Sequence, residues 1–332
     1  MNPAPIFECF SAYQKTAAMQ AAVDIGLFSA IAAAGAPAAA AHIAKTCNAS
    51  EKGVRILCDY WTVNGLLIKS GDTYGLTPEA AKFLDQKSPA YIGGVLGFIN
   101  GPIVPYFAQL TDAVRRGGRV EDGTVQAEYE GWIDFAQQMG AMMHPAAVAI
   151  ADILGPIKGG GSALDIAAGH GLFGIILAQK NPGLKITALD WPKVLEVAAK
   201  HAKQMGVGSD RYALLPGDAF TVDLLGGRGP HDVVLLTNLL HHFSEKQCVT
   251  LLKRIRAATK PGGRLVTLEF VPNEDRVSPP VPATFPLVML ATTAEGDAYT
   301  FAQLDRMLRE AGFAKNTLHQ PSESPQQIIV SE

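Results

Sequence analysis

The sequence predicts an α/β protein in which a mostly helical first half precedes a parallel sheet covered by helices on both faces. The first half has helical periodicity and ends at the glycine-rich run KGGGS (158–162). In the second half, short β-branched runs alternate with helical stretches, and these runs are too apolar to have a face in water. The length of 332 residues fits two domains.

Two long helices are predicted in the first half. Residues 13–33 and 126–154 carry apolar side chains at positions i, i+3, i+4 and i+7, and both segments are rich in Ala, Met and Leu. Such a stripe must pack against another apolar surface.

A winged-helix pattern lies between these helices. Residues 38–46 and 50–64 predict a helix, a turn and a second helix, and residues 66–76 predict a short hairpin. Asn48 and Ser50 are of the types that cap helix N-termini, so we expect them to open the second helix.

Charge indicates which partner this module binds. Within residues 50–64, Lys52 and Arg55 are balanced by Glu51 and Asp59, and the whole chain has a net charge of −3. A nucleic-acid reader needs a positive surface that recruits phosphates. We therefore expect no nucleic-acid partner, and an interaction or dimerisation role for the module.

Composition excludes several other classes. Hydrophobic residues make up 48% and charged residues 18%, which is too apolar for a disordered chain. We find no run of about 20 apolar residues that would span a membrane and no secretory signal. The four cysteines form no CxxC motif, so we expect free thiols, a cytoplasmic protein and no metal site.

The second half alternates strands and helices in a regular order. Strands are predicted for the runs ALDIAA, KITALD, YALLPGD, HDVVLLTN and GRLVTLEF, and helices for residues 172–180, 192–205 and 245–259. The last runs, FAKNTLHQ and QQIIVSE, predict a hairpin that completes the sheet.

A glycine loop follows the first of these strands. Gly169, Gly171 and Gly174 form a GxGxxG motif between a strand and a helix, where the backbone turns tightly and approaches a ligand. Asp190 ends the next strand about 20 residues later, where a carboxylate can accept both hydroxyls of a ribose. The run PGD at 216–218 ends a third strand at the same edge. A nucleoside-containing cofactor is therefore predicted.

The loop alone does not choose between a nicotinamide dinucleotide and S-adenosylmethionine. Asp165, within the loop strand, fits the amino-acid cation of S-adenosylmethionine better than a pyrophosphate. The late hairpin at the C-terminus also favours S-adenosylmethionine. A nicotinamide-dependent oxidoreductase stays open as an alternative, and so does a ligand-sensing winged-helix regulator.

The chain resembles the class I S-adenosylmethionine-dependent O-methyltransferases of the hydroxyindole and plant phenolic type. The motifs that carry the resemblance are LDIAAGHG, ALDWP, GDAF, LLHHFSEKQC, KPGGRLVTLEF and GDAYTFAQLDRMLREAGF. It implies a Rossmann-like, seven-stranded methyltransferase domain at 159–332, linking helices at 101–158 and a winged-helix dimerisation domain at 1–100. It also implies a homodimer that methylates a small molecule.

The resemblance also implies roles for individual residues. His241 falls where the family has its general base, and Glu269 where a carboxylate braces that base. The cofactor is expected at Asp165, Gly169, Gly171, Asp190, Trp191, Asp218, Ala219, Phe220 and Asn238. Glu269 pairing with Arg264 is the structural alternative.

The acceptor pocket should be apolar with few polar groups. Candidates from the linking helix and from the segment after Glu269 are Phe135, Met139, Met142, Met143, Phe285 and Met289. The proline-rich run 278–286 is expected to be a loop that enters a helix.

Three positions depart from the phenolic enzymes. His242 and Phe243 stand where the family has Asp and Trp, and Thr237 replaces a lysine. Transfer to carbon, nitrogen or sulfur therefore remains an alternative to transfer to a hydroxyl. We expect His242 to be an ordinary polar residue that projects away from His241.

Overall fold

The computed structural model describes residues 1–119, 123–126, 128–157 and 159–332. It divides into two compact units, Met1–Leu96 and Gly97–Glu332. Ala127, inside a predicted helix, and Lys158, at the predicted domain boundary, lie outside the described residues. The predicted linking segment, 101–158, falls within the second unit.

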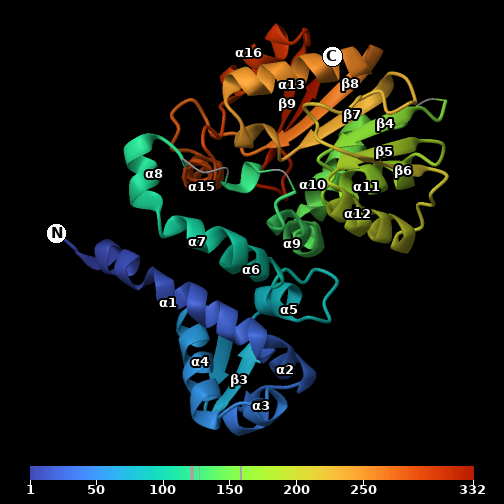
Figure 1. Cartoon of the computed structure of the whole chain (residues 1–332). Coiled ribbons are helices and arrows are strands. Elements are labelled where there is room, and N and C mark those ends of the chain that lie inside the picture. Colours follow the sequence, from blue (N-terminus) through green and yellow to red (C-terminus); the bar gives the residue numbers. More distant parts are fainter. Residues whose placement is uncertain (120–122, 127, 158) are drawn as a thin grey trace. The chain divides into compact units, whose positions relative to one another are not determined.

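The first unit is a winged helix preceded by two helices (Figure 1). Its elements are α1 (Ala4–Asp24), α2 (Leu27–Ala33), β1 (Ala38–Ala39), α3 (Ala40–Thr46), α4 (Glu51–Val63), β2 (Leu67–Ser70), β3 (Thr73–Leu76) and α5 (Pro78–Leu84). The three strands form an antiparallel sheet in the order β1-β3-β2. Phe28, Trp61 and Tyr74 are buried at its core. The predicted helix-turn-helix and hairpin are confirmed.

Two local predictions in this unit are wrong. The single helix expected over 13–33 breaks at Gly26, whose φ of 68° ends α1 and lets α2 start in a new direction. Ser50 caps α4 by accepting a hydrogen bond from the N–H of Gly53, at 3.1 Å. Asn48 adopts a left-handed φ of 49° in the preceding turn and does not cap the helix.

No single helix in the described part of the chain is both long and apolar enough to cross a membrane. The bent pair α1 and α2 passes that test only when the two helices are joined.

Short helices follow, the first of which spans the boundary between the two units. These are α6 (Val95–Phe98), the π-helix η1 (Ile99–Ile103), α7 (Val104–Phe107), α8 (Leu110–Arg116), the 3₁₀-helix η2 (Gly123–Val125), α9 (Gly131–Gln138) and α10 (Gly140–Leu154). The helix predicted over 126–154 starts later, at Gly131, and is interrupted at Met139.

A seven-stranded sheet forms the rest of this unit (Figure 1). The strands are β4 (Ser162–Ile166), β5 (Lys185–Asp190), β6 (Tyr212–Pro216), β7 (His231–Thr237), β8 (Thr259–Glu269), β9 (Asn316–His319) and β10 (Gln327–Ser331). Their order is β6-β5-β4-β7-β8-β10-β9, and only β10 runs antiparallel to its neighbours β8 and β9. The predicted parallel sheet with a late hairpin is confirmed.

Helices cover both faces of the sheet. On one side α10 packs against α11 (Leu172–Lys180), and α11 also contacts α12 (Pro192–Gln204). On the other side α13 (Glu245–Ala258) packs against α16 (Phe301–Glu310). Leu164 of β4 lies in a core with Leu251 of α13, whereas the next residue, Asp165, faces α11. Both faces of the strand are thus buried, as its apolar sequence predicts.

An insertion separates β8 from α16. It carries α14 (Pro280–Thr284) and α15 (Pro286–Thr292), so the proline-rich run 278–286 is already helical from Pro280 rather than a loop. Proline is tolerated there because the first turn of a helix needs no N–H donor.

Candidate active site

The glycine loop joins β4 to α11. Ala167, Gly169 and Gly171 all have positive φ angles, of 54°, 55° and 76°. A Cβ on residue 171 would lie 2.5 Å from the hydroxyl oxygen of Tyr212, so only glycine fits there. A Cβ on residue 169 would meet the ring of Phe135 at 3.5 Å, which places this aromatic side chain of α9 over the loop.

Asp190, at the end of β5, is bonded to the loop. One carboxylate oxygen accepts the N–H of Gly169 at 2.8 Å, and the other accepts the N–H of Trp191 at 2.7 Å. Burial raises the pKa of Asp190 to about 6, although the two N–H groups oppose that shift. Trp191 is partly buried and begins the turn into α12. The carboxylate therefore lies at the edge of the sheet where the predicted ribose would bind.

Asp165 does not lie where a ligand could reach it. Its side chain has no exposed surface, and its carboxylate accepts the N–H of Gly174 at 3.0 Å. Burial raises the pKa of this carboxyl well above its ordinary range. The expected contact with the cofactor's amino-acid cation is not supported, because a residue that lines an open site has accessible surface. Asp165 fixes the start of α11 instead.

The run GDAF follows β6. Asp218 accepts the N–H of Phe220 at 2.8 Å, and Ala219 is 8% exposed. The Phe220 ring meets that of Phe243 edge to face, with ring centroids 4.8 Å apart. The predicted adenine-flanking residues thus lie beside the segment that carries His241.

Asn238 follows β7 with a left-handed φ of 56°. Its side-chain oxygen accepts a hydrogen bond from Gln326, and its amide nitrogen lies 3.9 Å from the sulfur of Met143. The side chain of Asn238 is therefore already engaged with protein groups.

His241 and Glu269 form the most buried acid-base pair of the site. His241 lies on a 3₁₀ turn, Leu240–His242, just after β7, and Glu269 ends the adjacent strand β8. Nδ1 of His241 is 2.5 Å from Oε2 of Glu269, and these side chains are 6% and 4% exposed. Arg264 does not pair with Glu269: it donates to the carbonyl of Leu154.

Aromatic rings surround this pair. Phe285 meets the His241 ring edge to face at 4.9 Å, and Phe270 stacks on Phe285 at 4.0 Å. Trp132 meets the ring of His242 at 5.2 Å. Trp132 is not among the residues predicted from the sequence, although its position one helical turn before Phe135 indicates that both lie on the same face of a helix.

His242 corrects another expectation. Its ring lies 4.4 Å from that of His241 and is buried, whereas a strand end would have turned the two side chains apart. The 3₁₀ turn explains the difference, because it is not an extended strand. Burial, and then the neighbouring His241, lower the pKa of His242 well below its ordinary value.

The predicted methionines are divided between core and surface. Met139, Met143 and Met289 are 7%, 4% and 3% exposed, whereas Met142 is 42% exposed. Phe135 and Phe285 are the two predicted pocket residues that belong to the aromatic surroundings of the glycine loop and of His241. Among the described residues, no three His, Cys, Asp or Glu side chains are grouped to hold a metal ion.

Comparison with known proteins identifies the class. Residues 132–314 match the O-methyltransferase domain, and residues 7–86 match the O-methyltransferase dimerisation domain. The chain belongs to the S-adenosylmethionine-dependent O-methyltransferase family, which acts on small molecules. S-adenosylmethionine is its cofactor. The expected family, fold class and cofactor are confirmed, which removes the oxidoreductase and regulator alternatives.

Particular relatives support this assignment. The tetracenomycin polyketide synthesis 8-O-methyltransferase of Streptomyces glaucescens is 28% identical over 319 residues, which are 94% of this chain and 91% of that protein. A candidate O-methyltransferase of Nostoc punctiforme, solved by crystallography, is 41% identical with a TM-score of 0.93, covering 100% of this chain and 99% of that one. Human N-acetylserotonin methyltransferase, solved with S-adenosylmethionine, has a TM-score of 0.82 and covers 99% of this chain and 96% of that one; at 23% identity it shows that the fold is shared.

The residues present fit this cofactor. Gly169 and Gly171 have no side chains of their own, although Phe135 and Tyr212 pack near them, and each oxygen of Asp190 keeps a lone pair beyond its one N–H partner. A ligand with a ribose can therefore donate its hydroxyl groups to Asp190 beside the loop.

Proposed function

We propose that this protein methylates a hydroxyl group of a small aromatic metabolite, with His241 as the general base and Glu269 as its partner. The observation that supports this best is the 2.5 Å contact between Nδ1 of His241 and the carboxylate of Glu269. Histidine suits proton removal near neutral pH, and a carboxylate on its other nitrogen fixes the tautomer.

Glu269 is held on both sides. Its Oε1 accepts the N–H groups of Leu239 and Leu240, at 3.1 and 2.8 Å, so that Oε2 is directed at His241. Nδ1 of His241 keeps its proton by donating to this oxygen. Nε2 is then free to accept the proton of the acceptor's hydroxyl, and the carboxylate stabilises the imidazolium that forms.

When bound, S-adenosylmethionine supplies an electrophilic methyl group on a sulfonium. In our proposal Gly169 and Gly171 line its methionine part, Asp190 accepts the ribose hydroxyls, and Asp218 and Phe220 flank the adenine. The rings of Phe135 and Phe285 exclude water, which leaves alignment of the hydroxyl as the main task of the protein.

An aromatic acceptor fits these surroundings. Trp132, Phe135 and Phe285 offer flat apolar surfaces close to the base and the glycine loop, and aromatic rings favour stacked and edge-to-face partners. Two relatives, both 28% identical, are the tetracenomycin 8-O-methyltransferase and a 3-hydroxy-5-methyl-1-naphthoate 3-O-methyltransferase of Streptomyces sahachiroi. The second name describes a hydroxylated aromatic acceptor.

We also infer that the first 100 residues pair two copies of the chain, with residues 101–158 contributing to the acceptor pocket. Helix α1 exposes Ile6, Phe7, Phe10 and Tyr13 by 58 to 70%, and a contiguous apolar surface of this kind marks an interface. Sedimentation of the full chain should give a dimer. The double variant Phe7→Asp, Phe10→Asp should sediment as a monomer.

The acceptor class is tested with a panel of hydroxynaphthoates, phenols, anilines and thiols, incubated with methyl-labelled S-adenosylmethionine and examined by mass spectrometry. We expect label on an aromatic oxygen, and loss of turnover in His241→Ala with S-adenosylhomocysteine affinity within a few-fold of wild type. Label on nitrogen or sulfur alone would overturn the proposal that the acceptor is a hydroxyl group. Full turnover in His241→Ala would overturn the proposal that His241 is the general base.

A further inference from the structure

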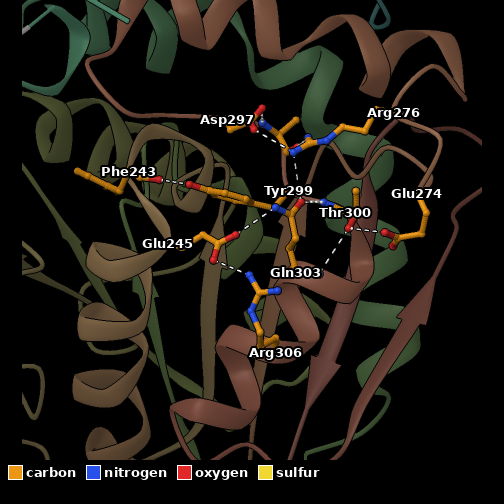
Figure 2. Close-up of polar contacts among 10 residues, drawn as sticks. Phe243, Glu245, Glu274, Arg276, Asp297, Tyr299, Thr300, Gln303 and Arg306 are labelled. Atoms are coloured by element: carbon orange, nitrogen blue, oxygen red, sulfur yellow. Dashed lines mark hydrogen bonds and ion pairs between the residues drawn. The ribbon is translucent and has the colours of Figure 1, made fainter. Parts of the chain in front are cut away.

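The insertion between β8 and α16 is closed at its base by polar contacts (Figure 2). Glu274, at its start, accepts the hydroxyl of Thr300 at 3.1 Å and the N–H of Ala302 at 3.3 Å. Arg276 donates to the carbonyl of Ala298 at 2.9 Å and to the carboxylate of Asp297 at 3.1 Å. Both ends of the insertion are therefore joined before the chain enters α16.

The same contacts extend to the first residue of α13. Gln303 donates to Glu245 at 3.0 Å, and Arg306 donates to its other oxygen at 2.5 Å. Figure 2 shows these side chains converging from α13 and α16 on the segment that contains Tyr299. We call Glu245, Glu274, Arg276, Tyr299 and Thr300 the polar clasp.

Within the polar clasp, Tyr299 is the residue that contacts the segment carrying His241. Its hydroxyl donates to the carbonyl of Phe243 at 2.5 Å, two residues after His241. The side chain of Tyr299 is buried in the core on the α13 and α16 side of the sheet. It therefore holds the backbone of the catalytic segment without lying among the rings around His241.

A second contact joins the insertion to this backbone. A Cβ on residue 296 would overlap the carbonyl oxygen of His241, so Gly296 permits the close approach. The hydroxyl of Thr293 accepts the N–H of Gly296 at 2.9 Å and so fixes this part of the insertion.

The insertion also carries a ring that contacts the base. Phe285 lies between its two joined ends and meets the His241 ring at 4.9 Å. The insertion whose ends the polar clasp joins thus touches both the ring and the backbone of His241.

Such support matters because the turn that carries His241 is weak by itself. A 3₁₀ turn of three residues has poor hydrogen-bond geometry and needs contacts from elsewhere to keep one conformation. A displacement of about 1 Å at a catalytic group can cost 10²-fold in rate.

We propose that Tyr299 is a positioning residue for the base, and that the polar clasp holds the turn Leu240–His242 and the insertion in the one arrangement that aligns His241 with the acceptor. This rests on the proposed role of His241. Tyr299 acts through the carbonyl of Phe243 and touches neither cofactor nor acceptor.

The test compares Tyr299→Phe, which removes only the hydroxyl, and Arg276→Gln with wild type. The matched control is Arg309→Gln: Arg309 also donates to an aspartate, Asp305, and to a backbone carbonyl, that of Ala314, but within and just after α16. Hydrogen exchange of the full-length protein needs no acceptor. We expect the amides of residues 240–244 to exchange at least tenfold faster in both test variants, with residues 165–190 and the control unchanged.

Kinetics with the acceptor found for wild type supply the second readout. We expect kcat to fall about tenfold or more in Tyr299→Phe, with S-adenosylhomocysteine affinity unchanged. If the amides of residues 240–244 exchange at the wild-type rate in Tyr299→Phe, the proposed role of the polar clasp is overturned, whatever the acceptor. An unchanged kcat in this variant would overturn it as well. Full turnover in His241→Ala would instead overturn the proposed base, while the exchange result would still decide whether the polar clasp holds the turn.

Discussion

Nδ1 of His241 lies 2.5 Å from Oε2 of Glu269, while the other oxygen of this carboxylate accepts the N–H groups of Leu239 and Leu240. One side chain from β8 thus binds both the imidazole ring and the backbone of the turn that presents it. Rotation of the carboxylate would break at least one of these bonds, so the ring and its turn are held together.

Glu269→Gln should therefore remove turnover without unfolding the protein. The amide oxygen can still accept the two N–H groups, which leaves the NH₂ group facing Nδ1. Nδ1 must then accept a hydrogen bond from the NH₂ group, so the imidazole carries its proton on Nε2. In that tautomer Nε2 can no longer take a proton from the acceptor's hydroxyl. We expect kcat to fall about 10²- to 10⁴-fold.

Calorimetry with S-adenosylhomocysteine and thermal unfolding should both resemble wild type in this variant. Glu310→Gln is the control, because it neutralises an exposed glutamate that pairs with Lys253 at 3.1 Å. A Glu269→Gln protein with wild-type kcat would show that the carboxylate does not set the tautomer.

At Gly171, the cost of steric overlap with Tyr212 can be measured separately from the cost of a left-handed backbone. Gly171 and Gly262 both have φ of 76°, but a Cβ on residue 262 would meet nothing within 4 Å. Alanine costs about 1–2 kcal/mol at either position from the left-handed backbone alone. Gly171→Ala should cost more, because its Cβ also meets the hydroxyl of Tyr212 at 2.5 Å.

Chemical denaturation of Gly171→Ala, Gly262→Ala and the double variant Gly171→Ala, Tyr212→Phe measures this difference. We expect Gly171→Ala to lose both stability and cofactor affinity, and the double variant to recover part of each. If Gly171→Ala and Gly262→Ala lose equal stability, the Tyr212 side chain moves aside without cost and the loop is not tightly packed.

Asp190 should make cofactor binding depend on pH. Burial raises its pKa to about 6, so it is largely protonated below that pH, and a protonated carboxyl offers fewer acceptors to the ribose hydroxyls. Affinity for S-adenosylhomocysteine should rise with pH up to about 6 and then level off. Calorimetry between pH 5 and 8, about one unit below and two above this pKa, should show the rise in wild type and none in Asp190→Asn.

Sequence patterns predicted most of the second unit because its signals are local. The helix expected at 172–180 is α11 with the same bounds, and the glycine loop precedes it as the motif requires. Strands β4, β5 and β7 were recognisable because both of their faces are buried, which leaves continuous apolar runs.

The errors occur where geometry is set by only a few residues. Gly26 inside an alanine-rich run did not reveal that the helix ends there, since an isolated glycine is tolerated in helices. The turn Leu240–His242 is too short to leave a periodic signal, yet it brings both histidine rings to the same place. Asp165 shows a third limit: a strand residue's type does not tell which face it occupies.

His170 and His242, which are two of the buried histidines, should make the fold sensitive to acid. Burial lowers the pKa of His170 to about 3, and burial together with His241 lowers that of His242 well below its ordinary value. Because the unfolded chain binds these protons near pH 6.5 and the folded chain does not, stability is fully present above pH 6.5 and is lost as pH falls. Each histidine should contribute about 1.4 kcal/mol per pH unit below that point.

Denaturant unfolding at several pH values checks this slope. His242→Leu removes a ring whose Nδ1 is buried without a partner among the described residues, so it should be at least as stable as wild type at pH 7.5 and lose less stability on acidification. His170→Asn should also flatten the slope because it removes the titrating ring. The shorter side chain can still accept the N–H of Leu172, which His170 accepts at 3.1 Å, so the loop should keep this hydrogen bond. Asp165 and Asp190 act in the opposite direction because burial raises the pKa of both carboxyl groups, so each variant is compared with wild type at the same pH. A wild-type slope in both variants would mean that these rings become protonated within the folded protein.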